Sequence, residues 1–251
     1  MKLLFTRRHW NKLAKIDPLW AVLTAPEKKN NRWSIDEFFA DGLSTVAAAI
    51  KEITAQYPAL RLGSALDFGC GVGRLTQGLA HHFEHVTGVD ISEEMLVHAR
   101  RFNGHGKRVA YVHNPRSDLH LFATGQFDLV YSLITLQHME PQYAKAYIAE
   151  FVRITAKGGV IFFQVPSQRL AEIPENTLLT HWPPTFFKRL RRRIKRRVNV
   201  WLASSPVMEM HAIPVGEVRS ILQKNGAEVL QATRYQAAGE LESWAYLARK
   251  L

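Results

Sequence analysis

The most informative stretch of this sequence places two carboxylates beside a glycine-rich turn. Asp67 precedes Gly69 and Gly71, and Asp90 follows at the end of the next apolar run. Glycine lets the backbone approach a ligand closely and adopt positive φ where a turn requires it. A carboxylate such as Asp90 can accept both hydroxyls of a ribose, and Asp67 suits a ligand with a positively charged amine. The pattern therefore predicts a site for a nucleoside-like ligand.

A nicotinamide dinucleotide is the main alternative ligand for such a turn. Its fingerprint, Gly-x-Gly-x-x-Gly/Ala, requires a small third residue, and counting from Gly69 places Arg74 there. The Arg74 side chain would obstruct the close helix–strand packing that glycine permits, although its charge suits a phosphate. Asp67 would repel a pyrophosphate. A dinucleotide therefore fits poorly, and the other alternative is a core turn that binds no ligand.

The elements that must position these residues alternate between strands and helices. Such alternation predicts an α/β fold with a doubly wound, mostly parallel seven-stranded sheet and helices on both faces. In this arrangement ligands bind at the carboxyl ends of the strands, where the turn lies. The expected strands cover residues 64–68, 85–90, 108–113, 127–132, 160–165, 227–232 and 244–249, and the expected helices cover 74–82, a segment capped by Ser92, 141–155 and 214–225.

A long helix is expected before the first strand. Ser34 and Glu37 have the spacing of a capping box, which predicts that the helix starts there. Apolar residues then recur every three or four positions and predict one buried face. That face comprises Ile35, Phe39, Leu43, Val46, Ile50 and Ile53.

Four segments resemble motifs of the class I S-adenosylmethionine-dependent methyltransferases, in particular their ubiquinone-biosynthesis-like, small-molecule branch. Residues 65–76 are similar to the first motif and 89–99 to the second. Residues 127–132 resemble the fourth strand, and 136–139 the turn after it. The resemblance covers about residues 62–165 and implies a Rossmann-like fold, the cofactor S-adenosyl-L-methionine and a methyltransferase activity.

The resemblance also implies which residues hold the cofactor. The methionyl end lies on the glycine-rich turn, the ribose on the carboxylate that ends the second strand, and the adenine beside the residues that follow. The family usually has an acidic residue that contacts the adenine amine, but Pro115 stands at that place, so Asn114, Asp118 or the backbone alone must substitute. The full set of expected cofactor-binding residues is Asp67, Gly69, Cys70, Gly71, Arg74, Asp90, Ile91, Met95, Asn114, Asp118 and Ser132.

Two histidines are candidate general bases for methyl transfer to a hydroxyl group. His138 follows the fourth strand, where the methyl group should point, and the alternative is that it only caps or packs the turn. His211 is the second candidate, and Tyr131 either binds substrate or packs. Histidines at 81, 82 and 85 lie at an expected helix end, where they suit the helix dipole better than a metal ion, so no metal site is predicted.

We divide the chain into four parts. They are an N-terminal helical cover (1–61), a cofactor-binding core (62–165), a basic helical insertion (166–208) and a C-terminal helix with two strands (209–251). The aromatic residues of the cover suit either a lid over the site or ordinary packing on the sheet. These residues are Trp10, Trp20, Trp33, Phe38 and Phe39.

The net charge of +11 is concentrated in the insertion. Eight basic residues and no acidic residue lie between Lys188 and Arg197. An amphipathic helix is expected over residues 185–202, and three uses compete: contact with an anionic membrane, attraction of an anionic acceptor, or packing of its apolar stripe on the domain. One cysteine, no secretory signal and no long apolar run favour a cytoplasmic protein, with peripheral membrane contact under the first use.

Three functions compete at this stage. The first is methylation, most simply at oxygen, of a small-molecule, lipid-linked or sugar-linked acceptor. The second is methylation of a nucleic acid such as RNA, which the basic run favours. The absence of an Asn/Asp-Pro-Pro-Tyr/Phe motif after the fourth strand, where Ser132-Leu133-Ile134 stands, opposes it. The third is a non-catalytic protein that binds S-adenosylmethionine, which the intact carboxylates and glycines disfavour.

Overall fold

A computed structural model describes residues 2–169, 209–238 and 241–251. The expected insertion helix over 185–202 lies outside these residues. The helices are α1 (Lys2–Ile16), α2 (Pro18–Val22), α3 (Ile35–Gln56), α4 (Arg74–Leu79), α5 (Glu93–Phe102), α6 (Pro141–Ile154) and α8 (Val215–Lys224), with short 3-10 turns at Pro26–Lys28, Gly106–Arg108 and Leu136–His138. The strands are β1 (Ser64–Phe68), β2 (His85–Asp90), β3 (Val109–His113), β4 (Phe127–Ser132), β5 (Thr155–Arg169), β6 (Ala227–Ala238) and β7 (Leu241–Lys250).

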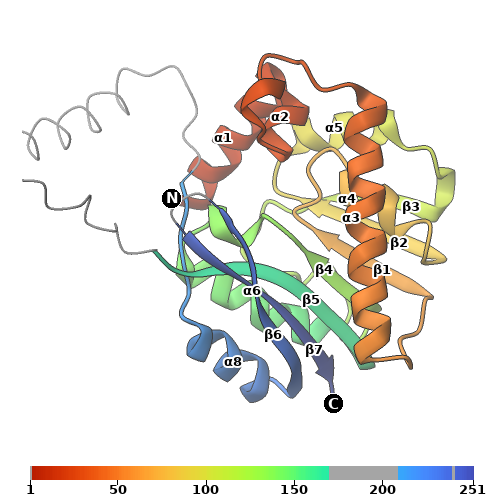
Figure 1. Ribbon diagram of the computed structural model, residues 1–251, viewed down its shortest axis with the longest axis vertical. Coiled ribbons are helices and arrows are strands. Elements are labelled where there is room, and N and C mark those ends of the chain that lie inside the picture. Colours follow the sequence, from red (N-terminus) through yellow and green to blue (C-terminus); the bar gives the residue numbers. More distant parts are fainter. Residues whose placement is uncertain (1, 170–208, 239–240) are drawn as a thin grey trace, which may run out of the picture.

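The strands form one seven-stranded sheet in the order β3-β2-β1-β4-β5-β7-β6. The first five pair in parallel, and β7 is antiparallel to both β5 and β6. One face of the sheet packs against α3 and α4, and the other against α6 and α8 (Figure 1). The predicted Rossmann-like α/β fold is confirmed. No helix in the described part of the chain is long and apolar enough to cross a bilayer.

The strands after the fourth are longer than the sequence predicts. β5 was expected over 160–165 but continues to Arg169, because it pairs with β7 well beyond the core. The register shifts between Pro166 and Gln168, where Pro166 lies opposite Ser243. Such an irregularity accommodates a proline, which cannot donate to the ladder. A turn-former in the sequence therefore lies within a strand.

Helix α3 buries a different face from the one predicted. Val46, Ile50 and Ile53 are buried as expected, but Ile35 and Leu43 are 52% and 39% exposed. The buried line instead runs through Phe38 and Gly42 in the first half of the helix. The reason is the close crossing with α4: a Cβ on Gly42 would lie 2.5 Å from the carbonyl oxygen of Arg74. The close contact between Gly42 and α4 therefore determines which side of α3 is buried.

The capping box predicted at the start of α3 does not form. Ser34 is the N-cap residue, but its side chain makes no capping hydrogen bond. The Glu37 carboxylate instead accepts from Lys28 Nζ at 2.7 Å, which joins α3 to the preceding 3-10 turn. The predicted cap on α5 is confirmed, since the Met95 amide donates to Ser92 Oγ at 3.2 Å.

Candidate active site

A cavity of about 970 Å³, including its open mouth, lies at the carboxyl ends of β1, β2 and β4. In the sheet β1 lies between β2 and β4, and doubly wound sheets bind ligands where the strand order reverses in this way. The walls of the cavity come from the turn after β1, the end of β2, the loop after β4 and helix α1. The predicted site residues that line it are Asp67, Gly69, Cys70, Gly71, Arg74, Asp90, Ile91, Met95, Asn114 and His138.

The turn after β1 depends on three glycines with positive φ. Gly69, Gly71 and Gly73 have φ of 74°, 53° and 86°. A Cβ on Gly69 would lie 2.1 Å from Thr135 Cγ2, and one on Gly71 would lie 2.6 Å from Val22 Cγ2. L-residues rarely adopt these backbone angles, and no side chain fits the space. The turn therefore brings bare backbone to the cavity wall.

Asp67 is a buried carboxylate at the base of the cavity. It is 1% exposed and accepts a hydrogen bond of 2.7 Å from Thr76 Oγ1. Burial raises the pKa of Asp67 from 3.8 to about 6, and the Thr76 hydrogen bond and the Arg74 charge oppose that rise. A carboxylate held this far from solvent is stabilised by a cation. The cavity can therefore bind a positively charged group beside Asp67.

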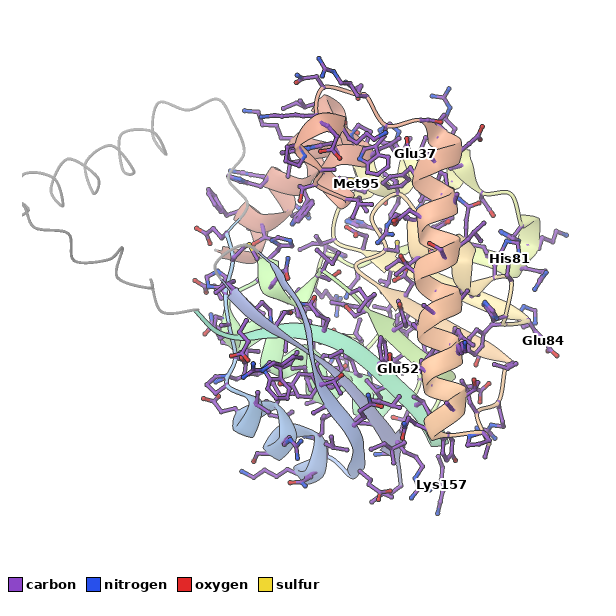
Figure 2. The ribbon with its side chains drawn as sticks, viewed as in Figure 1. Glu37, Glu52, His81, Glu84, Met95 and Lys157 are labelled. Atoms are coloured by element: carbon purple, nitrogen blue, oxygen red, sulfur yellow. The ribbon has the colours of Figure 1, made fainter. Side chains whose placement is uncertain are left out.

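Asp90 joins the end of β2 to the glycine turn. Its Oδ2 accepts from the Gly71 amide at 2.9 Å, and its Oδ1 accepts from the Ser92 amide at 2.8 Å. Burial raises the pKa of Asp90, and these backbone donors oppose that effect. Two donors leave lone pairs on both oxygens, so the carboxylate can still accept ligand hydroxyls. Met95 is buried against residues of α1 and α2, in the half of the molecule away from Lys157 (Figure 2).

Two other residues of the turn have restricted roles. The Arg74 side chain is 4% exposed and forms an ion pair with Asp41 of α3, which ties the turn to that helix. Cys70 is buried, and burial raises the pKa of its thiol well above the usual value. A protonated thiol is a poor nucleophile, so Cys70 serves as part of the wall.

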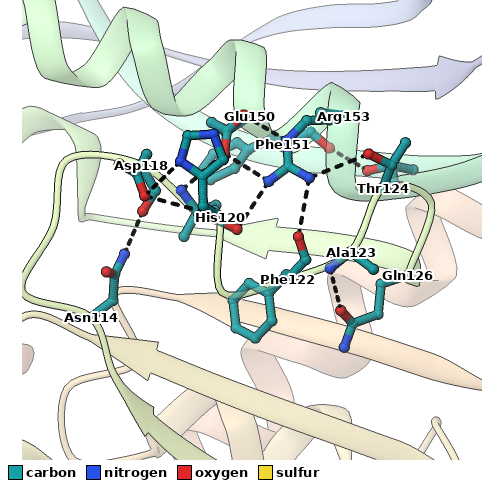
Figure 3. Close-up of polar contacts among 12 residues, drawn as sticks. Asn114, Asp118, His120, Phe122, Ala123, Thr124, Gln126, Glu150, Phe151 and Arg153 are labelled. Carbon is teal, nitrogen blue, oxygen red and sulfur yellow. Dashed lines mark hydrogen bonds and ion pairs between the residues drawn. The ribbon is translucent and has the colours of Figure 1, made fainter.

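The loop after β3 places Asn114 at the cavity and Asp118 away from it. Asn114 Nδ2 donates to the Asp118 carbonyl oxygen at 2.7 Å, which orients the Asn114 amide. The Asp118 carboxylate instead pairs with His120 (Figure 3). Arg153 and Glu150 of α6 hold the same loop through its backbone: Arg153 Nη2 donates to the Leu119 carbonyl oxygen at 2.9 Å, and Glu150 accepts from the Leu119 amide at 2.9 Å. Of the two substitutes considered for the adenine contact, only Asn114 faces the cavity.

Ser132 and Tyr131 lie behind the cavity wall. Ser132 is fully buried, and its Oγ donates to the Phe68 carbonyl oxygen at 3.0 Å, which ties β4 to β1. Ser132 is therefore not among the lining residues. Tyr131 is also fully buried and stacks on Phe162 with ring centroids 5.5 Å apart. Of the two interpretations of Tyr131, the structure supports packing.

His138 faces the cavity, whereas His211 supports the loop behind it. His138 Nδ1 lies 3.0 Å from the Glu209 carbonyl oxygen, and Trp10 packs against its ring edge-on at 5.3 Å. Burial lowers the pKa of His138, the hydrogen bond to the Glu209 carbonyl oxygen opposes that effect, and the nearby charge of His211 adds to it. His211 does not line the cavity; its amide donates to the Gln137 carbonyl oxygen at 2.8 Å.

The structure adds lining residues that the sequence did not identify. Leu3 and Thr6 come from the same face of α1 as Trp10, and Tyr147 comes from α6. The spacing of Leu3, Thr6 and Trp10 along α1 is helical and could have indicated a shared face, but the sequence analysis named only Trp10 for the site. The other N-terminal aromatics pack within the cover: Trp20 and Trp33 donate to backbone carbonyl oxygens, and Phe38 is fully buried.

No group of three potential ligands that could hold a metal ion occurs in the described ranges. His81 packs edge-on against His105 with ring centroids 4.9 Å apart. Burial lowers the pKa of His82 and of His105, and the nearby His81 lowers both further.

Comparison with known proteins gives this geometry a family context. Residues 65–159 match a family described as a methyltransferase domain. Over 100 residues, 39% of the chain, the sequence is 37% identical to a ubiquinone biosynthesis O-methyltransferase of Aromatoleum aromaticum, of which the match covers 42%. Over 117 residues, 45% of the chain, it is 31% identical to phosphoethanolamine N-methyltransferase 3 of Arabidopsis thaliana, of which the match covers 23%. The chain thus spans less than half of either relative.

A solved structure extends the likeness to the whole fold. Magnesium protoporphyrin IX methyltransferase from Synechocystis, crystallised with bound SAH, matches over 100% of both chains with a TM-score of 0.65 and 18% identity. At this identity the likeness concerns the fold. The family match thus covers a methyltransferase domain at residues 65–159, and the fold around it is that of the class I methyltransferases.

Proposed function

We propose that this protein transfers the methyl group of S-adenosylmethionine to an oxygen atom of a small-molecule acceptor, a class that includes lipid-linked and sugar-linked compounds. The observation that carries the proposal is the shared cavity, in which His138 lies on one wall and Asp67 and Asp90 on another. Its relatives include both O- and N-methyltransferases by name, so oxygen as the acceptor atom rests on His138.

The donor set of the cavity fits S-adenosylmethionine. Asp67 is buried with a raised pKa and suits the methionyl ammonium group. Asp90 has lone pairs left for the ribose hydroxyls. Gly69 and Gly71 leave no room for a Cβ, which supports close approach of the methionyl end to backbone. Ile91 and Met95 supply apolar surface for the adenine, and the Asn114 side chain lines the same cavity.

When bound, the cofactor supplies a methyl group on a positively charged sulfur. The Glu209 carbonyl oxygen can only accept a hydrogen bond, so His138 carries its proton on Nδ1 and keeps a lone pair on Nε2. Burial lowers the pKa of His138, so the ring stays neutral near pH 7. Nε2 lies 3.3 Å from the Gln137 amide nitrogen, and would take the hydroxyl proton of an acceptor once that amide moves aside.

The test uses labelled S-adenosylmethionine with fractionated cell extract. We expect label in a small-molecule or lipid fraction, and His138→Ala should lower turnover by about 10²–10⁴-fold with cofactor affinity nearly unchanged. His85→Ala is the matched control, because His85 is exposed at the opposite end of β2. Turnover of His138→Ala within a few-fold of the unsubstituted protein would show that His138 is structural. Label in RNA would favour the nucleic-acid alternative, and no transfer with intact cofactor binding would favour a non-catalytic protein.

For the basic segment over residues 185–202 we propose contact with an anionic membrane or an anionic acceptor. The support is its charge, because each basic residue near an anionic surface contributes on the order of 1 kcal/mol. Sedimentation with neutral and anionic vesicles, at low and high salt, tests the membrane version. Equal behaviour on both lipids without a salt effect would contradict it. An unchanged Michaelis constant after Lys/Arg→Gln substitution in this segment would contradict the acceptor version.

A further inference from the structure

A chain of buried hydrogen bonds runs behind the loop that follows β4. Gln164 of β5 is 2% exposed and Gln137 is 3% exposed. The Ile134 amide donates to Gln164 Oε1 at 3.0 Å, and Gln164 Nε2 lies 3.3 Å from Gln137 Oε1. Gln137 Nε2 lies 3.3 Å from His138 Nε2. The chain thus joins the backbone of the loop to the imidazole nitrogen that faces away from the Glu209 carbonyl oxygen.

Backbone groups at the two ends give this chain a fixed direction. The Ile134 amide can only donate, so Gln164 must turn its oxygen toward it and its nitrogen toward Gln137. The Glu209 carbonyl oxygen can only accept, so His138 must turn Nδ1–H toward it. Each amide between the two ends then donates toward His138, and Nε2 is the final acceptor. No other orientation satisfies every member of the chain.

The loop that this chain holds is strained. Ile134 has φ of 57°, a left-handed conformation that is a genuine outlier for a β-branched residue. Such strain persists only where the surroundings over-determine it. The hydrogen bond to Gln164 is the fixed contact at the Ile134 amide, and Gln164 is itself held by Ser243 of β7. Leu133, Ile134 and Thr135 all line the cavity, so their backbone shapes part of its wall.

We infer that Gln164 is a positioning residue that fixes the tautomer of His138 through Gln137 and holds the Ile134 turn against the cavity. Gln164 does not line the cavity, and therefore acts only through these neighbours. The inference gives the proposed base a neutral ring with its proton on Nδ1, and in that respect it rests on the proposed function.

Few charged groups compete with this chain at His138 among the described residues. The segment after the insertion contributes His211, whose ring lies 3.5 Å from the Glu209 carboxylate. Helix α1 contributes the uncharged ring of Trp10. Burial is the largest cause of the lowered His138 pKa, and the donor from Gln137 favours the same neutral form.

The test is the isosteric variant Gln164→Glu, studied by NMR titration of the histidines in the full chain. A glutamate at this position still accepts from the Ile134 amide but cannot donate to Gln137. The Gln137 amide should then turn its nitrogen toward the carboxylate and its oxygen toward His138, which favours a proton on Nε2. We expect the pKa of His138 to rise by about one unit, the equivalent of one hydrogen bond. The His138 signal is assigned by its loss in His138→Ala.

Gln223→Glu is the matched control, because it makes the same chemical change at an exposed position of α8 and should leave the His138 pKa unchanged. Gln137→Met provides a second route to the same result if Gln164→Glu fails to fold, since it removes the donor to Nε2 at similar volume. An unchanged His138 pKa and Nδ1–H tautomer in the folded variant would overturn the inference.

The two proposals fail in different ways. The NMR titration needs neither cofactor nor acceptor, so it tests the hydrogen-bond chain alone. The pH–rate profile then tests the base: if the His138 pKa rises in Gln164→Glu and the acid limb of kcat/KM rises with it, both proposals stand. If the pKa rises while the profile does not move, the chain stands and the assignment of His138 as base is refuted.

Discussion

Replacement of Asp67 by asparagine should make the ligand-free protein more stable while it weakens cofactor binding. Burial raises the pKa of Asp67 from 3.8 to about 6, so the folded protein holds this carboxylate at a cost. The difference of about two units corresponds to about 3 kcal/mol at neutral pH. The asparagine side chain would keep the shape and could still accept from Thr76 Oγ1, without the charge.

The size of this effect depends on pH. Between about pH 4 and pH 6 the folded state binds a proton at Asp67 that the unfolded state has released, so stability falls as pH rises through this window. The Asp67→Asn variant has no carboxylate at this position, so its stability does not fall in this way as pH rises. The gain in unfolding free energy of the variant should therefore be near zero at pH 4 and reach up to about 3 kcal/mol above pH 6.

Urea unfolding at pH 4, 5, 6 and 7 without cofactor measures the gain, and calorimetry at pH 7 measures cofactor affinity. A cofactor ammonium beside Asp67 should also lower its pKa, so binding at pH 6 should release a proton, detected as a dependence of the binding enthalpy on buffer ionisation. A variant that is less stable at pH 7, or that binds the cofactor as tightly as before, would refute the assignment of Asp67 as a buried charge reserved for a cation.

Two further substitutions test the cofactor site. Asp90→Ala should weaken binding of S-adenosylmethionine or its demethylated product by about 1–3 kcal/mol, because the ribose hydroxyls lose a charged partner; calorimetry that shows unchanged affinity, or NADH binding instead, contradicts this. Gly71→Ala should destabilise the fold by about 1–2 kcal/mol, since φ is 53° and the new Cβ meets Val22. Gly216→Ala is its control in denaturant unfolding, because no atom lies within 4 Å of a Cβ there, and equal stability of the two variants would contradict the reasoning.

The parts of the fold predicted well are those with local signals. The strands at Ser64–Phe68, His85–Asp90 and Phe127–Ser132 have the predicted bounds, because short apolar runs end at turns in each case. The buried face of α3 was predicted wrongly in its first half. A helical period of apolar residues does not show which small residue meets the neighbouring helix, and Gly42 adds nothing to such a period because glycine has no side chain.

The same limit applies to the candidate site. Asp67 and Asp90 were predicted to lie together because the ends of neighbouring parallel strands meet at one edge of the sheet, and both line the cavity. Asp118 follows a strand in the same way, yet its carboxylate turns toward His120. Leu3 and Thr6 were not predicted, because an apolar helical stripe looks the same in sequence whether it faces a core or a cavity. Gln137 and Gln164 come together only through the β4–β5 pairing.

Helix α1 contributes part of the cavity wall from outside the range that matches the methyltransferase family. Leu3, Thr6 and Trp10 lie outside residues 65–159, which match the methyltransferase family, whereas Asp67 and Asp90 lie inside them. Mutations in this first helix can reshape the cavity while the two carboxylates keep their hydrogen-bond partners. Substitutions can therefore alter the shape of the cavity and the geometry of the glycine turn independently of each other.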